Sequence, residues 1–69
     1  MVEIFRTTVQ EENQARSIIH YFQTIYPDYQ INFDLEDCDK ILRIEGEEIQ
    51  VPDIIRHANT MGIKIEHCL

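Results

Sequence analysis

Hydrophobic and polar residues alternate along four stretches of the chain, and this period of two predicts β-strands. The four stretches are residues 2–9, 29–35, 40–45 and 63–69. In the first stretch, Phe5, Thr7 and Val9 share the face that we expect to be buried. The short polar segment Glu36–Asp39 indicates a tight turn, so the second and third strands are expected to form a hairpin.

Two other segments have the period of about 3.6 residues that is typical of an amphipathic helix. In residues 11–26, the hydrophobic side chains form one stripe: Ala15, Ile18, Ile19, Phe22, Ile25 and Tyr26. Pro27 ends this helix, because the residue before a proline avoids helical backbone angles. The second helix is predicted for residues 52–61, with Pro52 in its first turn and Gly62 directly after its end.

The predicted order of elements is strand, helix, strand, strand, helix, strand, within a single domain of residues 1–69. Right-handed crossovers and one hydrophobic face per element lead to an α+β fold, a ferredoxin-like sandwich. We expect a four-stranded antiparallel sheet in the order 4-1-3-2, with both helices on one face. The opposite face should be mostly polar, with Ile4 and Ile41 as its hydrophobic members.

Matches to a known family extend along nearly the whole chain. They are the first strand ending in Phe5-x-Thr7-x-Val9, a helix opening with Ala15-x-x-Ile18, the hairpin, and Val51-Pro52-x-Ile54-Ile55 leading to Met61-Gly62-Ile63. In these positions the chain resembles the heavy-metal-associated domain of copper chaperones and of the amino-terminal modules of P-type metal ATPases. The resemblance implies the ferredoxin-like fold and a role in copper or zinc binding or transport.

The metal loop of that family has the pattern M-x-C-x-x-C between the first strand and the first helix. Alignment on Ile18 places the methionine position at Val9 and the two cysteine positions at Glu11 and Gln14. Two thiolates hold monovalent copper or zinc, whereas a glutamate is a single hard ligand and a glutamine is neutral. We therefore expect a heavy-metal-associated type of domain that lacks the metal loop, and no cofactor.

Cys38 is the remaining candidate for a metal ligand. Together with Asp37, Asp39 and Glu11 it offers donors for a divalent ion, if the turn and the first loop lie at the same end of the sheet. Neighbouring carboxylates disfavour the thiolate form that binds metals, so an exposed turn with an incidental cysteine is the simpler interpretation. Cys68 is expected at the opposite end of the sheet, too far away for a disulfide.

The sequence contains no pattern that indicates catalysis. Ser17 lies inside a predicted helix, and no glycine-rich phosphate loop is present. His20 and His57 fall beside the hydrophobic stripes of their helices, and His67 shares the inward face of the last strand. Because no two histidines have the spacing of a helical metal site and the acidic turn lacks an enclosing pocket, we do not expect an enzyme.

The net charge of −7, from 13 acidic and 6 basic side chains, affects which partners are expected. It repels phosphate backbones, which argues against nucleic acid and favours a basic protein partner. No hydrophobic run is long enough to cross a bilayer, and residues 1–9 have a strand pattern instead of an export signal. We expect no membrane association, a cytoplasmic location with reduced cysteines, and a monomer or weak dimer.

Five acidic residues should converge on one end of the domain: Glu11, Glu12, Glu36, Asp37 and Asp39. Such an end can steer a basic partner, and it can equally well stabilise a helix N-terminus and solubilise a turn. The leading hypothesis is a non-catalytic protein-interaction module that acts through this end or through the sheet face of Ile4 and Ile41. The alternative is a metal-binding protein centred on Cys38.

Overall fold

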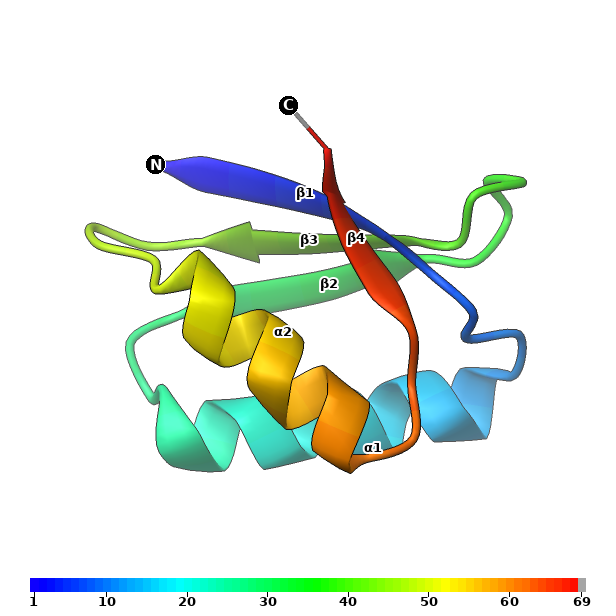
Figure 1. Cartoon of the computed structure of the whole chain (residues 1–69), viewed down its shortest axis with the longest axis horizontal. Coiled ribbons are helices and arrows are strands. Elements are labelled where there is room, and N and C mark those ends of the chain that lie inside the picture. The colour runs from blue at the N-terminus through cyan, green and yellow to red at the C-terminus, as the bar shows by residue number, and fades with distance from the viewer. Residues whose placement is uncertain (69) are drawn as a thin grey trace.

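The structure, a computed structural model that describes residues 1–68, has the predicted ferredoxin-like order of strands and helices (Figure 1). The elements are β1 (Val2–Thr7), α1 (Glu12–Ile25), β2 (Gln30–Asp34), β3 (Ile41–Glu45), α2 (Val51–Thr60) and β4 (Ile65–Cys68). The predicted elements differ from these only at their ends, where strands lose residues to the adjoining loops. The last residue of the predicted strand 63–69 lies outside the described residues.

The four strands form one antiparallel sheet in the order β2-β3-β1-β4, which is the predicted order counted from the other edge. β1 lies between β3 and β4, and β2 pairs only with β3. β2 and β4 are therefore the two edge strands. Both helices cover the same face of the sheet, as predicted (Figure 1).

The hydrophobic core fills the space between the sheet and the helices. Its largest fully buried side chains are Phe5, Val9, Phe22, Leu42, Ile44 and Ile54. The stripe predicted for α1 is confirmed at Ala15, Ile18 and Phe22, whereas Ile25, in the last turn, is 37% exposed. Burial of a large hydrophobic side chain contributes about 1.5–3 kcal/mol to stability, so this cluster is the main support of a small fold.

A polar pair also lies on the helix-covered side of the sheet, and the sequence pattern did not reveal it. The Nε2 atom of His67 lies 2.6 Å from the Oε1 atom of Glu3, and both side chains are mostly buried. The His67 ring also packs against Phe5, with 5.2 Å between the ring centroids. His67 faces inward as predicted, and this pair joins β1 to β4.

The open face of the sheet is mostly polar, as predicted. Ile4 and Ile41 are half-buried there, and each lies opposite an arginine of the neighbouring strand. Arg43 is the partner of Ile4, and Arg6 is the partner of Ile41. The two isoleucines are therefore diagonal neighbours on this face and not direct partners.

Tyr29 is held in place by contacts on several sides. Its ring stacks on Tyr26, with centroids 4.7 Å apart and an angle of 12° between the planes. Its hydroxyl donates to the carbonyl of Glu48 at 2.8 Å and accepts from the backbone N–H of Gln50 at 3.2 Å. A Cβ atom at Gly46 would lie only 2.9 Å from Cδ1 of this ring, so Gly46 leaves the space that Tyr29 occupies.

We predict that Gly46→Ala lowers the free energy of unfolding by about 1–3 kcal/mol, because the fixed Tyr29 ring cannot move away from the added methyl group. Urea denaturation measures this cost. In a Tyr29→Ala background the same change should cost much less, since the space is then open. Equal costs in both backgrounds would contradict the steric explanation.

Candidate functional site

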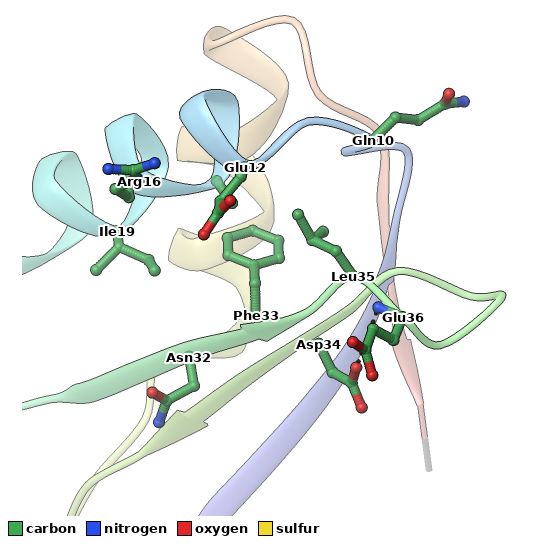
Figure 2. Close-up of a pocket in the computed structure, with 10 residues that line it drawn as sticks. Gln10, Glu12, Arg16, Ile19, Asn32, Phe33, Asp34, Leu35 and Glu36 are labelled. Atoms are coloured by element: carbon green, nitrogen blue, oxygen red, sulfur yellow. Dashed lines mark hydrogen bonds between the residues drawn. The ribbon is translucent and has the colours of Figure 1, made fainter.

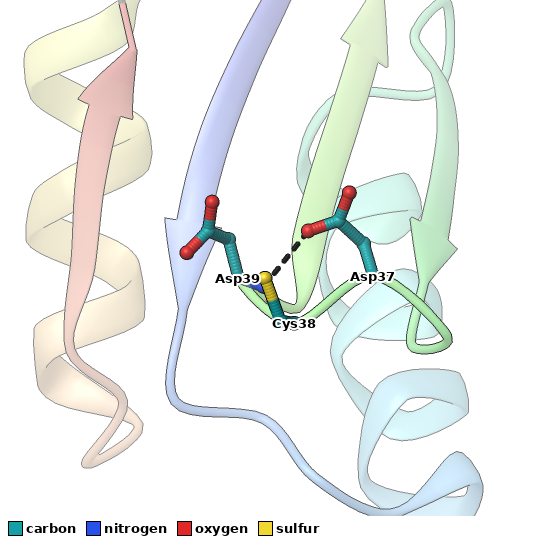
Figure 3. A group of neighbouring side chains, drawn as sticks. All are labelled: Asp37, Cys38 and Asp39. Atoms are coloured by element: carbon teal, nitrogen blue, oxygen red, sulfur yellow. Dashed lines mark hydrogen bonds between the residues drawn. The ribbon is translucent and has the colours of Figure 1, made fainter.

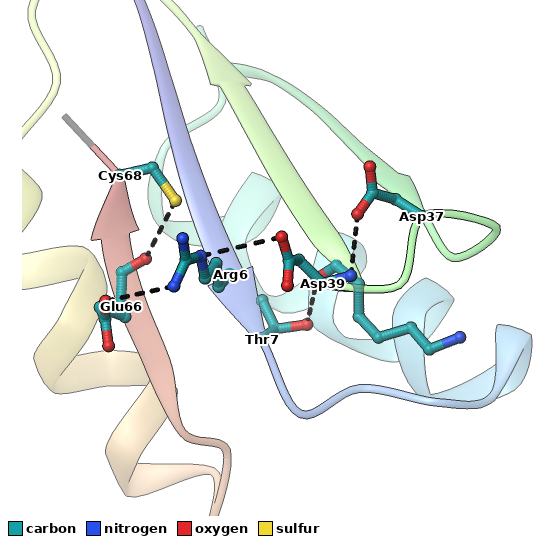
Figure 4. Close-up of polar contacts among 7 residues, drawn as sticks. Arg6, Thr7, Asp37, Asp39, Glu66 and Cys68 are labelled. Atoms are coloured by element: carbon teal, nitrogen blue, oxygen red, sulfur yellow. Dashed lines mark hydrogen bonds and ion pairs between the residues drawn. The ribbon is translucent and has the colours of Figure 1, made fainter.

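The loop between β1 and α1 lies beside the turn between β2 and β3, as the predicted topology requires. Thr7 makes the connection: its backbone N–H donates to the carbonyl of Asp39 at 3.2 Å. Its hydroxyl donates to the carbonyl of Lys40 at 2.6 Å (Figure 4). The same hydroxyl accepts from the N–H of Val9 at 3.2 Å. Thr7, on the helix-covered face of β1, thus joins the two loops.

The turn between β2 and β3 is shaped by its own polar side chains. The Oδ1 atom of Asp34 accepts the backbone N–H groups of Glu36 and Asp37 at 3.2 and 3.3 Å. The Oδ1 atom of Asp37 accepts the N–H of Asp39 at 2.8 Å. Lys40, in the left-handed region with φ of 51°, donates from Nζ to the carbonyl of Leu35 at 2.8 Å. Two of the acidic residues therefore stabilise the turn directly.

The candidate metal ligands Asp37, Cys38 and Asp39 lie together at the tip of this turn (Figure 3). One donor atom from each lies within 4.8 Å of the others, and all three residues are exposed. Among the described residues this group does not include Glu11. The Oδ2 atom of Asp39 also lies 3.8 Å from Nε of Arg6 (Figure 4), so an incoming cation would compete with a positive charge already present.

The five predicted interaction residues occupy three positions around this end. Glu12 and Glu36 line one groove, together with Asp34. Asp37 and Asp39 lie at the turn tip, where Asp39 approaches the open face of the sheet. Glu11 precedes α1 and is exposed, and its side chain makes no capping hydrogen bond. The acidic residues thus share an end of the domain without forming a single cluster.

The groove runs between α1 and β2 and has a volume of about 650 Å³ (Figure 2). Its hydrophobic lining includes Ala15, which is buried, and Ile19, Phe33 and Leu35, which are only half-buried. The alternating pattern correctly predicted that Phe33 and Leu35 face the helices. It did not show that the residues of α1 above them, among them the small Ala15, leave them partly uncovered.

Asn32 and Asp34 line the same groove, although they point to the opposite side of β2 from Phe33 (Figure 2). Successive side chains of a strand point to opposite faces of the sheet. Residues of both faces can therefore line one groove only if the groove lies at the edge of the strand. The groove therefore follows the free edge of β2. Glu12, Asp34 and Glu36, which we call the groove acids, lie along it.

The remaining candidate residues lie elsewhere. His20 is exposed, and His57 is half-buried with its Nδ1 atom 3.2 Å from the Tyr21 hydroxyl. His57 also packs edge-on against Phe22 and Tyr26, and burial, with a further contribution from the Asp53 carboxylate, raises the pKa of Tyr26. This aromatic group is a packing feature at the edge of the core.

Cys68 lies on the open face beside Ile4, and Cys38 lies at the turn tip; both are free thiols. Arg6 lies between the two regions, since it also approaches Glu66 at 3.8 Å (Figure 4). Cys68 is paired with the middle of β1, three residues before the Thr7 that contacts the turn, and the two thiols are not bonded to each other.

Comparisons with models of protein families, with curated proteins and with solved structures find no match for this chain. Within residues 1–68, neither helix has the length and hydrophobicity needed to cross a bilayer. The geometry of the groove and of the turn therefore supplies the basis for a functional proposal.

We predict that Asp34→Ala loosens the turn, because two backbone N–H groups lose their acceptor. The expected loss of stability is about 1–2 kcal/mol, with faster amide exchange at Glu36 and Asp37. Asp34→Asn keeps the acceptor oxygen without the charge and should retain most of the protection. If Asn and Ala have the same effect, the role of Asp34 is electrostatic and the turn does not depend on these hydrogen bonds.

Proposed function

We propose that this protein is a small non-catalytic interaction module that engages a basic partner protein through the end formed by the first loop and the turn. The observation that carries the proposal is the groove, where the groove acids lie beside exposed parts of Ile19, Phe33 and Leu35. Hydrophobic contact area bordered by charge of one sign is typical of a specific binding surface.

The carboxylates of the groove are not neutralised by ion pairs within the described residues. Within residues 1–68, Glu12 and Glu36 take part in no ion pair, whereas Glu3, Asp39 and Asp53 do. Unpaired carboxylates beside hydrophobic side chains leave a local negative field. The only basic residue that lines the groove, among those described, is Arg16, whose Nη2 atom lies 3.4 Å from Oδ1 of Asn13.

We further propose that the chain is a heavy-metal-associated type of domain that has retained the fold without the metal loop. Val9, at the methionine position of that family's motif, is fully buried and keeps its packing role. Glu11 and Gln14, at the cysteine positions, are exposed and bring no thiolate. The chain thus keeps the residues that shape the loop, and this supports a binding role that does not involve metal.

A metal-binding role centred on Cys38 is the second candidate, because three donor atoms lie within 4.8 Å at the turn tip. Zinc is the most suitable ion for a thiolate with carboxylates. Two features favour the interaction module over this candidate. Asp37 already accepts a backbone hydrogen bond, and Asp39 lies close to Arg6.

We predict that a capped, lysine-rich peptide shifts the NMR signals of residues 10–12 and 33–39 more than those of the acidic segment around Asp28 and Glu47. Neutralising Glu12 and Glu36 together (E12Q/E36Q) should weaken binding by about fivefold, because two exposed charges are lost. The matched double variant D28N/E47Q removes the same charge at the other end and should change binding by less than about twofold. Equal losses in both variants would show that the peptide responds only to net charge.

We predict that Cys38→Ser leaves the zinc affinity of the reduced protein unchanged, with binding in both proteins too weak to define a site. Isothermal titration with zinc, and competition titration with monovalent copper, measure this. The prediction rests on the exposed, incomplete ligand set. One-to-one binding at about micromolar strength or tighter that is lost in Cys38→Ser would instead establish the metal-binding candidate.

A further inference from the structure

The backbone of β2 presents unused hydrogen-bonding groups at the groove. Met1 and Gly46, the pair next to Val2 and Glu45 in the register of β1 and β3, exchange two hydrogen bonds at 2.8 and 3.0 Å. Hydrogen-bonded pairs alternate along an antiparallel ladder, so the even-numbered residues of β3 also direct their backbone groups toward β1. The odd-numbered residues of β3 therefore face β2, where their register partners are positions 30, 32 and 34. It follows that Ile31 and Phe33 direct their N–H and carbonyl groups to the free edge of β2.

The side chains at this edge have two different characters. On the helix side, Ile19, Phe33 and Leu35 offer hydrophobic contact, next to Glu12 and Arg16 of α1. On the other side, Asp34 and Glu36 offer negative charge (Figure 2). A strand placed against β2 would direct alternate side chains to these two sides. A matching strand would place hydrophobic side chains against the hydrophobic side of the edge. Its alternate residues would be basic and would face the acidic side.

We infer that the groove binds an extended segment of a basic protein, which pairs with β2 as a fifth strand and alternates hydrophobic with basic residues. This inference rests on the proposed function and specifies how the partner is held. Main-chain hydrogen bonds to Ile31 and Phe33 supply part of the affinity, and the groove acids select the charge of the segment.

The charges of the molecule favour this occupant over two other arrangements. The second edge strand, β4, borders a smaller hollow of about 210 Å³ whose lining has two basic residues, Arg6 and Lys64, and one acidic residue, Glu66. The lining of the groove at β2 has three acidic residues and one basic residue, Arg16. A basic segment is therefore directed to β2 and away from β4. A second copy of the chain would bring two sets of groove acids together, and like charges at such close range repel each other.

The test uses the whole protein and a capped peptide of about eight residues that alternates valine and lysine. Two control peptides are needed: one with glutamate in place of lysine, and one with N-methyl groups on the backbone nitrogens that would face β2. Binding is measured by fluorescence anisotropy, and amide hydrogen exchange is measured by NMR with and without the peptide.

We expect the valine–lysine peptide to bind and to slow exchange of the Ile31 and Phe33 amides by at least about tenfold at saturation, with no protection of the β4 edge. The N-methylated peptide should lose this protection and bind at least about tenfold more weakly, and the glutamate peptide should not bind. Ile19→Lys, which places a positive charge in the groove, should weaken binding of the valine–lysine peptide. Its thermal unfolding, followed by circular dichroism, verifies that the variant is folded.

Two results would overturn the strand-pairing inference while leaving the proposed function intact. In the first, the N-methylated peptide binds as tightly as the unmethylated one, and its binding still depends on Glu12 and Glu36. In the second, analytical ultracentrifugation shows a dimer of the protein, and its contact lies at β2. If binding of the valine–lysine peptide depends on neither the groove acids nor the backbone, the proposed function fails as well.

Discussion

Thr7 makes the hydrogen bonds that bring the rest of this end of the molecule together. It ends β1 on the buried side of the sheet, where a hydrophobic residue would continue the pattern. Instead, its N–H and hydroxyl hold the carbonyl groups of Asp39 and Lys40. Because the same hydroxyl accepts from Val9, the loop that leads into α1 and the turn between β2 and β3 are positioned relative to each other. The groove between α1 and β2 depends on that arrangement.

The fold could be predicted from the sequence because its signals are local and repeated. The stripe through Ala15, Ile18 and Phe22 identifies α1, and the strict alternation of residues 29–35 identifies β2 and its inward face. The topology then follows from the order of the elements. It also correctly places Val9 in the core and the acidic turn beside the first loop.

The groove and the polar pairs could not be predicted in the same way, because they depend on distances between segments far apart in the chain. Alternation shows which way Phe33 points, but whether it is covered depends on the size and position of residues in α1. Glu3 and His67 are separated by 64 positions, and only the pairing of β1 with β4 brings them together. The role of Asp34 as an acceptor for two amides is a local signal that a closer consideration of turn chemistry would have found.

The contact of Tyr29 with Gly46 has a consequence for how this chain can vary in evolution. Tyr29 leads into β2 and Gly46 follows β3, and the space between them is filled by a single ring. A larger residue at position 46 requires a smaller residue at position 29. A smaller residue at position 29, however, leaves the backbone groups of Glu48 and Gln50 without the hydroxyl that they now contact. The two positions should therefore covary among homologues, and the path of the chain from β3 into α2 should change with them.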